Sequence, residues 1–433
     1  MNDLRGKKLL LLGGVQPMCE VVKEARKLGV IVYVTDYLED SPAKKIADKS
    51  FLVSTTDVDR IVDLCLKEGV NGVFTGYTDS MLPYCRQICD RLGFPFWGNE
   101  KNVEKCIDKT KFKLMCEEVG IKVVPWKIAN ADNYNEVKDQ LNFPVVIKPV
   151  DNSGSRGVYK CFSKEKYNDL CKKSLAFSKK GEIMIERMMN LNNEFSVYYM
   201  LYKGKSYLSQ SGDRYVHAVD SNKAPIGQGM SFPSIHLNEW INKMEPLMKN
   251  LFKRNEMNDG FVFMQGFYEN GDFFMHEAGY RLAGGFAYKY VDWMSGYNQV
   301  QQLIRYSLTG EMQLTEIEKS NPFFCKNTFL LTVAMNPGKI DSIEGLEEIE
   351  NISGVMEVCQ LHFVGDDISS VGATSRVFAY ILCVIDSKKQ LSELIEKIAT
   401  ALVVKNTQNQ NMLTELVSPD KIHLFYEDEN TNR

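Results

Sequence analysis

The stretch FPVVIKPVDNSGSRGVYKC, from Phe143 to Cys161, joins a buried strand to a loop suited to an anion. Lys148 stands in an otherwise apolar, valine-rich strand, where a lysine needs a charged partner. The loop Asp151–Gly157 consists mainly of small residues, whose backbone N–H groups can approach phosphate oxygens closely. A lysine at the base of such a loop adds a point charge. We therefore interpret this stretch as a phosphate site.

This loop differs from a Walker A site, because it joins two strands and lacks the Gly-Lys-Ser/Thr ending that leads into a helix. The structural alternative is a flexible hairpin whose lysine extends its ammonium group to water. The position of Lys148 within a run of valine and isoleucine favours the phosphate site.

The composition is typical of a globular protein with more than one domain. The 433 residues are 44% hydrophobic and 25% charged, and about two to four domains are expected at this length. A net charge of −4 supplies no overall basic field, so we expect no nucleic-acid partner. No run of about 18 uncharged apolar residues is present, which predicts that the chain does not span a membrane.

Cysteine and histidine usage favours a reduced, cytoplasmic protein without a zinc site. The apolar run in MNDLRGKKLLLLGG is too short for an export signal. Eleven cysteines are scattered without a CxxC pair, and five histidines form no HExxH-like cluster. We therefore expect free thiols, mostly in the core, and a cytoplasmic location.

About the first hundred residues alternate strand and helix patterns, which predicts a parallel, doubly wound sheet. Gly13 and Gly14 follow the first strand, and Asp36 lies near the end of the second. This arrangement resembles a dinucleotide site, although a full GxGxxG is absent. A nicotinamide-dependent oxidoreductase is therefore one functional alternative, and a plain tight turn is the structural one.

Charged residues recur at the ends of the later elements. Lys109 begins an amphipathic helix, Glu186 ends a strand before two methionines, and Glu194 begins another strand. The segment FMQGFYENGDFFMHEAGYRLAGG, from Phe263 to Gly285, predicts a hairpin of two apolar strands with His276, Glu277 and Arg281 at its end. An acid and a base in that position indicate a polar site rather than core.

Together these motifs resemble the ATP-grasp superfamily, including its carboxylate–amine ligases and its members similar to biotin carboxylase and to the large subunit of carbamoyl-phosphate synthase. The ordered set is Asp-Lys, Ile-Lys-Pro, Gly-Ser-Arg-Gly, Ile-Glu-Arg, Asn-Glu-Phe-Ser and Glu-x-x-x-Arg. The implied fold is α/β and α+β, with an N-terminal Rossmann-like parallel domain, a two-lobed ATP-grasp module and a C-terminal α+β domain. The expected bounds are 1–98 for the N-terminal domain, 99–120 for a helical link, 121–205 for the small nucleotide-binding lobe, 206–315 for the central lobe and 316–433 for the C-terminal domain.

The resemblance assigns ATP to the small lobe. Lys109 and Lys148 would hold the phosphates under a mobile loop made of Ser153, Gly154, Ser155, Arg156 and Gly157. Glu186, Arg187 and Met188 would contact adenine, with Glu186 on its amino group, and Glu194 would meet the ribose hydroxyls. An apolar slot beside acceptors and cations suits a nucleotide physically.

The resemblance also implies a Mg²⁺ (or Mn²⁺) site on the hairpin. In the family, two acids and an Asn carry the ion between the ATP phosphates. Glu277 matches the second acid, whereas Gln265 stands at the first acidic position and Gly279 at the Asn position. A Gln carbonyl can still ligate the ion, and water could fill the place of the missing Asn side chain.

The implied reaction is ATP-dependent ligation of a carboxylic acid, amino acid or peptide-like, to an amine through an acyl phosphate. Arg281 and Lys148 would act in catalysis, and the substrate side would comprise Arg281, Gly284, Gly285, Asp213 and Arg376. The partners are then small molecules, and a homodimer is a candidate assembly. Because two metal-ligand positions are altered, a nucleotide-binding protein with weak or lost ligase activity remains an alternative, beside the oxidoreductase.

Overall fold

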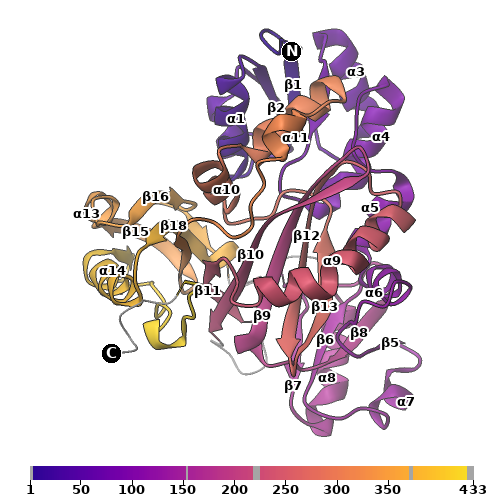
Figure 1. The fold of residues 1–433 in the computed structure, drawn as a ribbon, viewed down its shortest axis with the longest axis vertical. Coiled ribbons are helices and arrows are strands. Elements are labelled where there is room, and N and C mark those ends of the chain that lie inside the picture. Colours follow the sequence, from indigo (N-terminus) through magenta and orange to yellow (C-terminus); the bar gives the residue numbers. More distant parts are fainter. Residues whose placement is uncertain (1–2, 153–154, 218–224, 370–373, 427–433) are drawn as a thin grey trace.

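A computed structural model describes residues 3–152, 155–217, 225–369 and 374–426, and their strands form four sheets. A parallel sheet lies at one end of the long axis, a small antiparallel sheet lies at the other, and an eight-stranded antiparallel sheet lies between them (Figure 1). The predicted fold class is thereby confirmed. Within these residues, no helix combines the length and apolar character needed to cross a bilayer.

The N-terminal sheet has the strand order β3–β2–β1–β4, and every pair is parallel. The run Leu9–Leu12 is buried because helices cover both faces of the sheet, as in doubly wound folds. The elements are β1 (Lys8–Leu12), α1 (Met18–Lys27), β2 (Ile31–Thr35), α2 (Pro42–Ile46), β3 (Lys49–Phe51), α3 (Val58–Glu68), β4 (Gly72–Phe74), the 3-10 turn η1 (Asp79–Met81) and α4 (Leu82–Leu92).

The Gly13–Gly14 turn is closed by the protein's own side chains. The Asp36 carboxylate accepts hydrogen bonds from the N–H groups of Gly14 (2.7 Å) and Leu38 (2.9 Å). A side chain at Gly14 would meet the Ser41 hydroxyl at 2.1 Å. A tight turn therefore accounts for these residues, and the structure offers nothing that favours the nicotinamide alternative.

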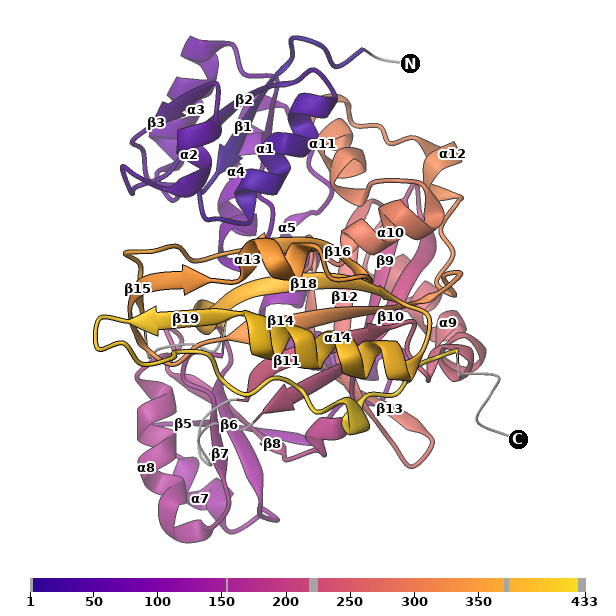
Figure 2. The ribbon, with the colours of Figure 1, turned by 90° about the vertical axis from the view of Figure 1, so that its left-hand side faces the viewer.

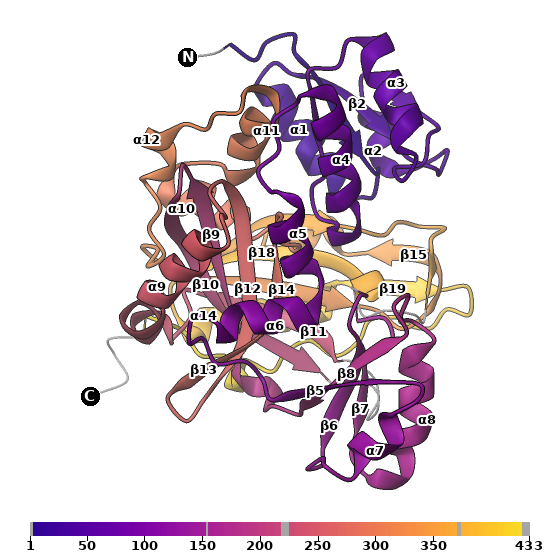
Figure 3. The ribbon, with the colours of Figure 1, turned by 90° about the vertical axis from the view of Figure 1, so that its right-hand side faces the viewer.

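Two helices, α5 (Glu100–Ile107) and α6 (Lys109–Glu117), lead from this unit to the small sheet (Figure 3). Asp108 ends α5 and caps α6 by accepting from the N–H groups of Thr110 (2.9 Å) and Lys111 (3.0 Å), which fixes the position of Lys109. The small sheet has the order β5–β8–β6–β7. Its elements are β5 (Trp126–Asn130), α7 (Tyr134–Lys138), β6 (Val145–Pro149), β7 (Tyr159–Cys161), α8 (Lys164–Leu175) and β8 (Glu182–Arg187).

The eight-stranded sheet has the order β13–β12–β9–β10–β11–β14–β18–β16. Its elements and the helices between them are η2 (Leu191–Asn193), β9 (Glu194–Tyr202), β10 (Lys205–His217), β11 (Ile226–Phe232), α9 (Leu237–Arg254), β12 (Gly260–Glu269), β13 (Asp272–Gly279), α10 (Tyr288–Ser295), α11 (Gln299–Thr309), α12 (Leu314–Ile317), β14 (Asn327–Ala334), β16 (Val355–Gln360) and β18 (Val377–Ile385). The expected boundary at 205/206 lies within β10, and the one at 315/316 lies within α12, which connects strands of this same sheet. The division into domains remains a prediction.

A second layer covers the C-terminal part of the large sheet. It contains the helix α14, which lies across β14 and β18, and a three-stranded sheet in the order β17–β15–β19 (Figure 2). The elements are β15 (Gly338–Glu344), α13 (Leu346–Glu350), β17 (Asp367–Ile368), η3 (Thr374–Arg376), α14 (Lys388–Ala401), β19 (Val403–Asn406) and η4 (Pro419–Lys421). All eleven cysteines are free thiols, and all but the exposed Cys325 are buried.

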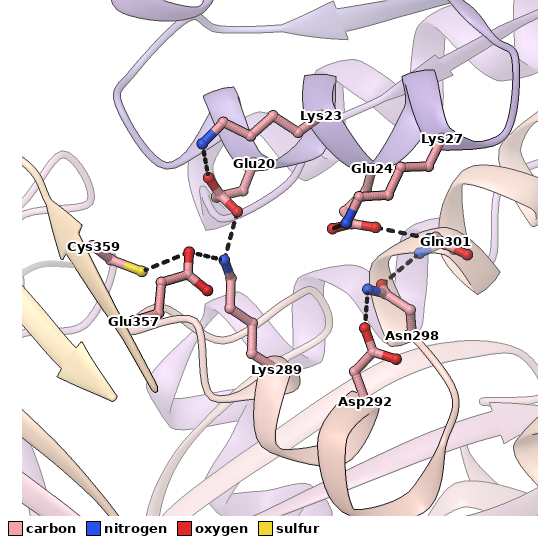
Figure 4. A network of polar contacts seen from close by, with 10 residues as sticks. All are labelled: Glu20, Lys23, Glu24, Lys27, Lys289, Asp292, Asn298, Gln301, Glu357 and Cys359. Carbon is pink, nitrogen blue, oxygen red and sulfur yellow. Dashed lines mark hydrogen bonds and ion pairs between the residues drawn. The ribbon is translucent and has the colours of Figure 1, made fainter. Parts of the chain in front are cut away.

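Lys289 connects three parts of the chain (Figure 4). Its ammonium group lies 2.8 Å from the Glu20 carboxylate on α1 and 2.5 Å from the Glu357 carboxylate on β16, while Lys289 itself belongs to α10. A parallel branch joins Glu24 of α1 to Gln301 of α11 at 2.8 Å. These contacts hold the N-terminal sheet against the large sheet.

Lys289→Met keeps the aliphatic volume but leaves Glu20 and Glu357 without their shared cation. We expect the free energy of unfolding to fall by about 3 kcal/mol, the low end for breaking a buried ion pair, because Glu357 is partly exposed. Urea denaturation measures the change. Lys23→Met is the matched control, since Lys23 also pairs with Glu20 but is 61% exposed and should cost less than about 1 kcal/mol. Equal losses in both variants would contradict the role given to Lys289.

Candidate active site

A cavity of about 810 Å³ lies between the small sheet and the eight-stranded sheet. One face of the large sheet forms its floor. The small sheet, α5, α6 and the segment Tyr77–Ser80 form its walls. A volume of this size is typical of a small-molecule site.

Five residues on five neighbouring strands form a continuous row across this floor. Each is the direct cross-strand partner of the next, so all share one face of the sheet: Phe267, Glu194, Arg214, Met230 and Leu330. We call this set the floor row. It runs from β12 through β9, β10 and β11 to β14. Its side chains are, in this order, aromatic, acidic, basic and then twice apolar.

Two lysines share one carboxylate at the wall opposite the floor. The Glu186 carboxylate lies 2.8 Å from the Lys113 ammonium group and 2.7 Å from that of Lys148, and all three side chains are almost fully buried. Burial raises the pKa of Glu186, but the fields of Lys148 and Lys113 outweigh this effect and lower it to about 2. Lys113 also donates to the Val124 carbonyl at 2.7 Å. Lys148 thus has the charged partner that its strand requires.

This geometry gives Glu186 a task other than the one implied by the resemblance. Both of its oxygens face lysines, because two buried ammonium groups need a counter-ion. The N–H groups of Arg187 and Met188 donate to the carbonyls of Pro125 (2.9 Å) and Pro144 (3.2 Å). A purine bound here would therefore meet carbonyl oxygens and side chains of this segment. The nearby wall is apolar and contains Val146, Met188, Met189, Leu191 and Phe267.

Lys109 lies at the mouth of the predicted phosphate loop. Its ammonium group donates to the Asn152 carbonyl at 2.6 Å, and burial lowers its pKa. Ser155 (φ 59°) and Gly157 (φ 75°) adopt the left-handed backbone conformation, which turns the loop back into β7. Ser155 and Arg156 line the cavity, whereas Ser153 and Gly154 lie outside the described residues.

A bulge in the hairpin directs two consecutive side chains into the cavity. Gln265 pairs with Glu277 and Gly266 with Met275, so His276 is an extra residue on β13. His276 and Glu277 both line the cavity as a result. Among the described residues, no hydrogen bond engages Nε2 of His276, which is buried. Burial raises the pKa of Glu277, but His276 and Lys109 outweigh this effect and lower it, so the carboxylate is ionised.

The place of the missing Asn side chain at position 279 is occupied by an aromatic ring. Gly279 pairs with Phe263, and a Cβ at Gly279 would meet the Phe263 ring at 2.2 Å. An Asn side chain at this position would therefore require the ring to move, and the expectation that water completes the metal site stays a prediction. Gln265 donates to the Ser196 hydroxyl at 3.4 Å. A divalent cation would find one ionised carboxylate here, which suits an ion held mainly by phosphate oxygens and water.

Each guanidinium nitrogen of Arg281 donates a hydrogen bond within the protein. Its guanidinium pairs with both oxygens of Asp79, donates to the Leu282 carbonyl at 2.7 Å, and lies 5.0 Å from the centre of the Phe263 ring. Asp79 belongs to η1 of the N-terminal unit. The pair thus ties that unit to the end of the hairpin.

The remaining predicted substrate residues divide into two groups. Gly284 and Gly285 line the cavity. Asp213 and Arg376 are not among its lining residues. Asp213 accepts from the Ser234 hydroxyl (2.6 Å) and the Ile235 N–H (2.8 Å), and Arg376 donates to the Met335 carbonyl at 2.7 Å.

Comparison with known proteins supports the family resemblance. A family model described as the D-ala D-ala ligase C-terminus matches residues 115–212. The formate-dependent phosphoribosylglycinamide formyltransferase of Maridesulfovibrio salexigens is 28% identical over 223 residues, which are 48% of this chain and 54% of that protein. The chain thus spans about half the length of the curated relatives it matches.

Solved structures extend the likeness to the whole fold. The L-amino acid ligase of Bacillus licheniformis superposes with a TM-score of 0.76 at 18% identity, covering 93% of this chain and 99% of that one. The biotin carboxylase domain of Hydrogenobacter thermophilus 2-oxoglutarate carboxylase gives a TM-score of 0.74 at 17% identity, covering 92% and 91%. The family model and the curated relatives support the resemblance to the ATP-grasp superfamily, and the solved structures show the same fold.

Within this site, the sequence-based prediction missed Lys113 and Asp79, and it chose Asp213 over its neighbour Arg214. Lys113 lies one helical turn after Lys109 on the same helix face, a spacing that could have revealed it. Arg214 follows Asp213, and strand alternation sends the two side chains to opposite faces, so only knowledge of the buried face selects Arg214. Asp79 gave no signal, because its partner Arg281 is 202 residues away.

The buried Asp213 predicts a pH-dependent stability. Burial raises the pKa of its carboxyl to about 7, although the hydrogen bonds from Ser234 and Ile235 oppose this. A folded-state pKa above the unfolded value means that folding takes up a proton between about pH 4 and 7, so the contribution of Asp213 to stability falls as pH rises through that range, by up to ~1.4 kcal/mol per unit. Thermal unfolding of the wild type and of Asp213→Asn across pH 4–8 measures this. The wild type should lose stability relative to the variant as pH rises, and parallel curves would contradict the assignment.

Proposed function

We propose that this chain is an ATP-dependent ligase that activates a carboxylic acid as an acyl phosphate and joins it to an amine. The observation that carries the proposal is the order of groups in one cavity: an apolar wall, then the lysines around Glu186, then the ionised Glu277. An apolar slot suits a purine, cations suit phosphates, and a carboxylate facing them suits Mg²⁺.

The names of the similar proteins support this class of reaction. One is a formate-dependent formyltransferase and another is an L-amino acid ligase. The biotin carboxylase domain was solved with ADP, magnesium and bicarbonate. The likeness to the two solved structures supports the fold alone, so the acid and the amine are not specified by it.

In the proposed reaction, one carboxylate oxygen of the acid attacks the γ-phosphorus of ATP, and the bond from that phosphorus to the β-phosphate oxygen breaks. ADP leaves, and the amine nitrogen then attacks the acyl carbon, releasing phosphate and one proton. Lys148 and Lys109 would hold the phosphates in line and neutralise their charge. Magnesium held by Glu277, with Gln265 as a neutral second ligand, would add charge neutralisation. Lys113 positions Lys148 through their shared carboxylate.

A nucleotide-binding protein that does not catalyse ligation is the second candidate. It is favoured by the Phe263 ring at the position of the third family ligand and by the neutral Gln265 at the position of the first. ADP release with a panel of carboxylic acids and amines separates the two. Tight ATP binding with no ADP release in any combination would favour the second candidate.

Lys148→Ala tests the phosphate assignment. Glu186 keeps Lys113 as its partner, so the variant should fold, and Mg²⁺–ATP should no longer raise the melting temperature. Differential scanning fluorimetry with and without nucleotide measures this. Lys164→Ala, at a lysine that is 51% exposed on α8, is the control and should keep the full shift. A full nucleotide shift in Lys148→Ala would overturn the assignment.

Gln265→Glu tests the metal assignment. It would place a second carboxylate directly opposite Glu277, so Mn²⁺ in the presence of ADP should bind roughly tenfold more tightly, a gain of ~1.4 kcal/mol. Electron paramagnetic resonance of free Mn²⁺ measures this without turnover. Gln408→Glu, at an exposed position, is the matched control. Unchanged Mn²⁺ affinity in Gln265→Glu would show that Gln265 does not face the ion.

A further inference from the structure

Arg214 and Arg281 are two of the arginines that line the cavity, and they differ in how far their nitrogens are engaged. Nε, Nη1 and Nη2 of Arg281 all donate to Asp79 or to the Leu282 carbonyl. Arg214 pairs with Glu194 through Nη1, and within the described chain its Nε and Nη2 have no acceptor. An incoming carboxylate would have to displace Asp79 from Arg281, whereas at Arg214 it would meet open donors.

Gly227 keeps those donors of Arg214 accessible. A Cβ at Gly227 would lie 3.6 Å from Nη2 and 3.9 Å from Nε of Arg214, so the absent side chain leaves that edge of the guanidinium uncovered toward the cavity. Arg214 is 29% exposed, which places its donors in the cavity and not in bulk water. A partly buried, open guanidinium edge binds carboxylates strongly, and two parallel N–H groups fit both oxygens.

Arg214 also lies where the proposed reaction requires the acid substrate to bind. The Glu277 carboxylate and the Tyr380 phenol both act electrostatically on its guanidinium. An acid held at Arg214 therefore lies beside the carboxylate proposed to hold the metal, within reach of the phosphates. The floor row places Glu194 on the nucleotide side of Arg214.

On its other side, the floor row is apolar. Met230 and Leu330 follow Arg214 on the next two strands, about 5 and 10 Å farther along the sheet. Ala283 and Val377 line the same cavity. The polar groups that line the cavity beside Leu330 are the hydroxyls of Thr332 and Tyr380, which carry no charge. A charged substrate side chain there would lose its hydration without a charged partner.

Because Gly284 has no side chain, it leaves space in the cavity for the side chain of the acid. Its Cβ would have no atom within 4 Å, and its backbone is not in the left-handed region, so side chains can be introduced without strain and would project into open space. In contrast, a Cβ at Gly229 would meet the Phe329 ring at 2.6 Å, and Gly285 has a φ of +83°. Gly227 and Gly284 are thus the cavity glycines at which substitutions test the site and not the fold.

We infer that Arg214 binds the carboxylate of the acid substrate and that the acid is compact and apolar, with its side chain over Met230 and Leu330. This inference rests on the proposed ligase function. It assigns to Arg214 the carboxylate contact that the family resemblance gives to Arg281, and it makes Gly284 the residue that sets the size of the acid.

Hydroxylamine provides the assay, because it replaces the unidentified amine and converts an acyl phosphate to a hydroxamate. The acids are L-alanine, L-leucine, L-methionine, L-aspartate, L-lysine and 3-methylbutanoate. Leucine, methionine or 3-methylbutanoate should support hydroxamate formation and ADP release at lower concentration than aspartate or lysine. Binding of Mg²⁺–ATP is measured separately by calorimetry.

The variants test separately the contact of the substrate carboxylate with Arg214 and the space available for the substrate side chain. Arg214→Met should raise the KM for the best acid by about 10- to 100-fold, the loss of a charge-assisted contact. Because it also leaves Glu194 unpaired, Gly227→Val serves as the second variant, which covers the open edge while keeping the Arg214–Glu194 pair, and it should raise the same KM. Gly284→Leu should exclude leucine but retain alanine, with Gly284→Ala intermediate. The affinity for Mg²⁺–ATP should be unchanged in Gly227→Val and both Gly284 variants.

The outcomes distinguish this inference from the function on which it rests. If ATP binds and hydroxamate forms, but Gly227→Val and Gly284→Leu leave the KM and the acid preference unchanged, the inference fails and the ligase function stands. Preference for aspartate or lysine, or ATP binding without turnover of any apolar acid, also overturns it. If the wild type binds no ATP, the proposed function itself fails.

Discussion

The buried carboxylate of Glu186 is the interaction on which the active-site architecture depends. It lies on β8 and neutralises Lys148 of β6 and Lys113 of α6. Each ammonium group, buried alone, would cost several kcal/mol, so the two lysines fix α6 against the small sheet only while Glu186 is ionised. The triad keeps one net positive charge. The same contact that closes the wall therefore prepares it for an anion.

The geometry of the β12–β13 hairpin is set by the register in which its two strands pair. The bulge at His276 turns Glu277 toward the cavity, and the pairing of Phe263 with Gly279 fills the space beside it with an aromatic ring. Arg281 then lies against that ring. The Phe263 ring thus contacts both Gly279 and Arg281. A side chain at position 279 would require Phe263 to move.

Local patterns predicted the elements, and they located those site residues whose chemistry conflicts with their surroundings. Lys148 in a valine-rich strand indicated a charged partner, and Glu277 at the end of an apolar hairpin indicated a polar site. Patterns of this kind do not identify the partner, because Glu186 is 38 positions from Lys148 and reaches it only through the pairing of β6 with β8. Asp213 and Arg214 show a second limit. Adjacent residues on one strand face opposite sides, and which side is the cavity depends on the order of eight strands from distant parts of the chain.

The pairing of charges indicates how one carboxylate could suffice for the proposed metal site. Glu186, Glu194 and Asp79 are each matched by a lysine or an arginine, whereas no hydrogen bond or ion pair within the described chain engages the carboxylate of Glu277. A triphosphate beside the lysines would face that carboxylate and be repelled by it. A divalent cation held by Glu277 would neutralise that repulsion. With Gln265 in place of a second acid, the proposed site would attract a free cation only weakly, and most of the oxygen ligands would have to come from the nucleotide. On this proposal, a glutamine at position 265 would favour entry of the metal together with ATP over a metal bound in advance.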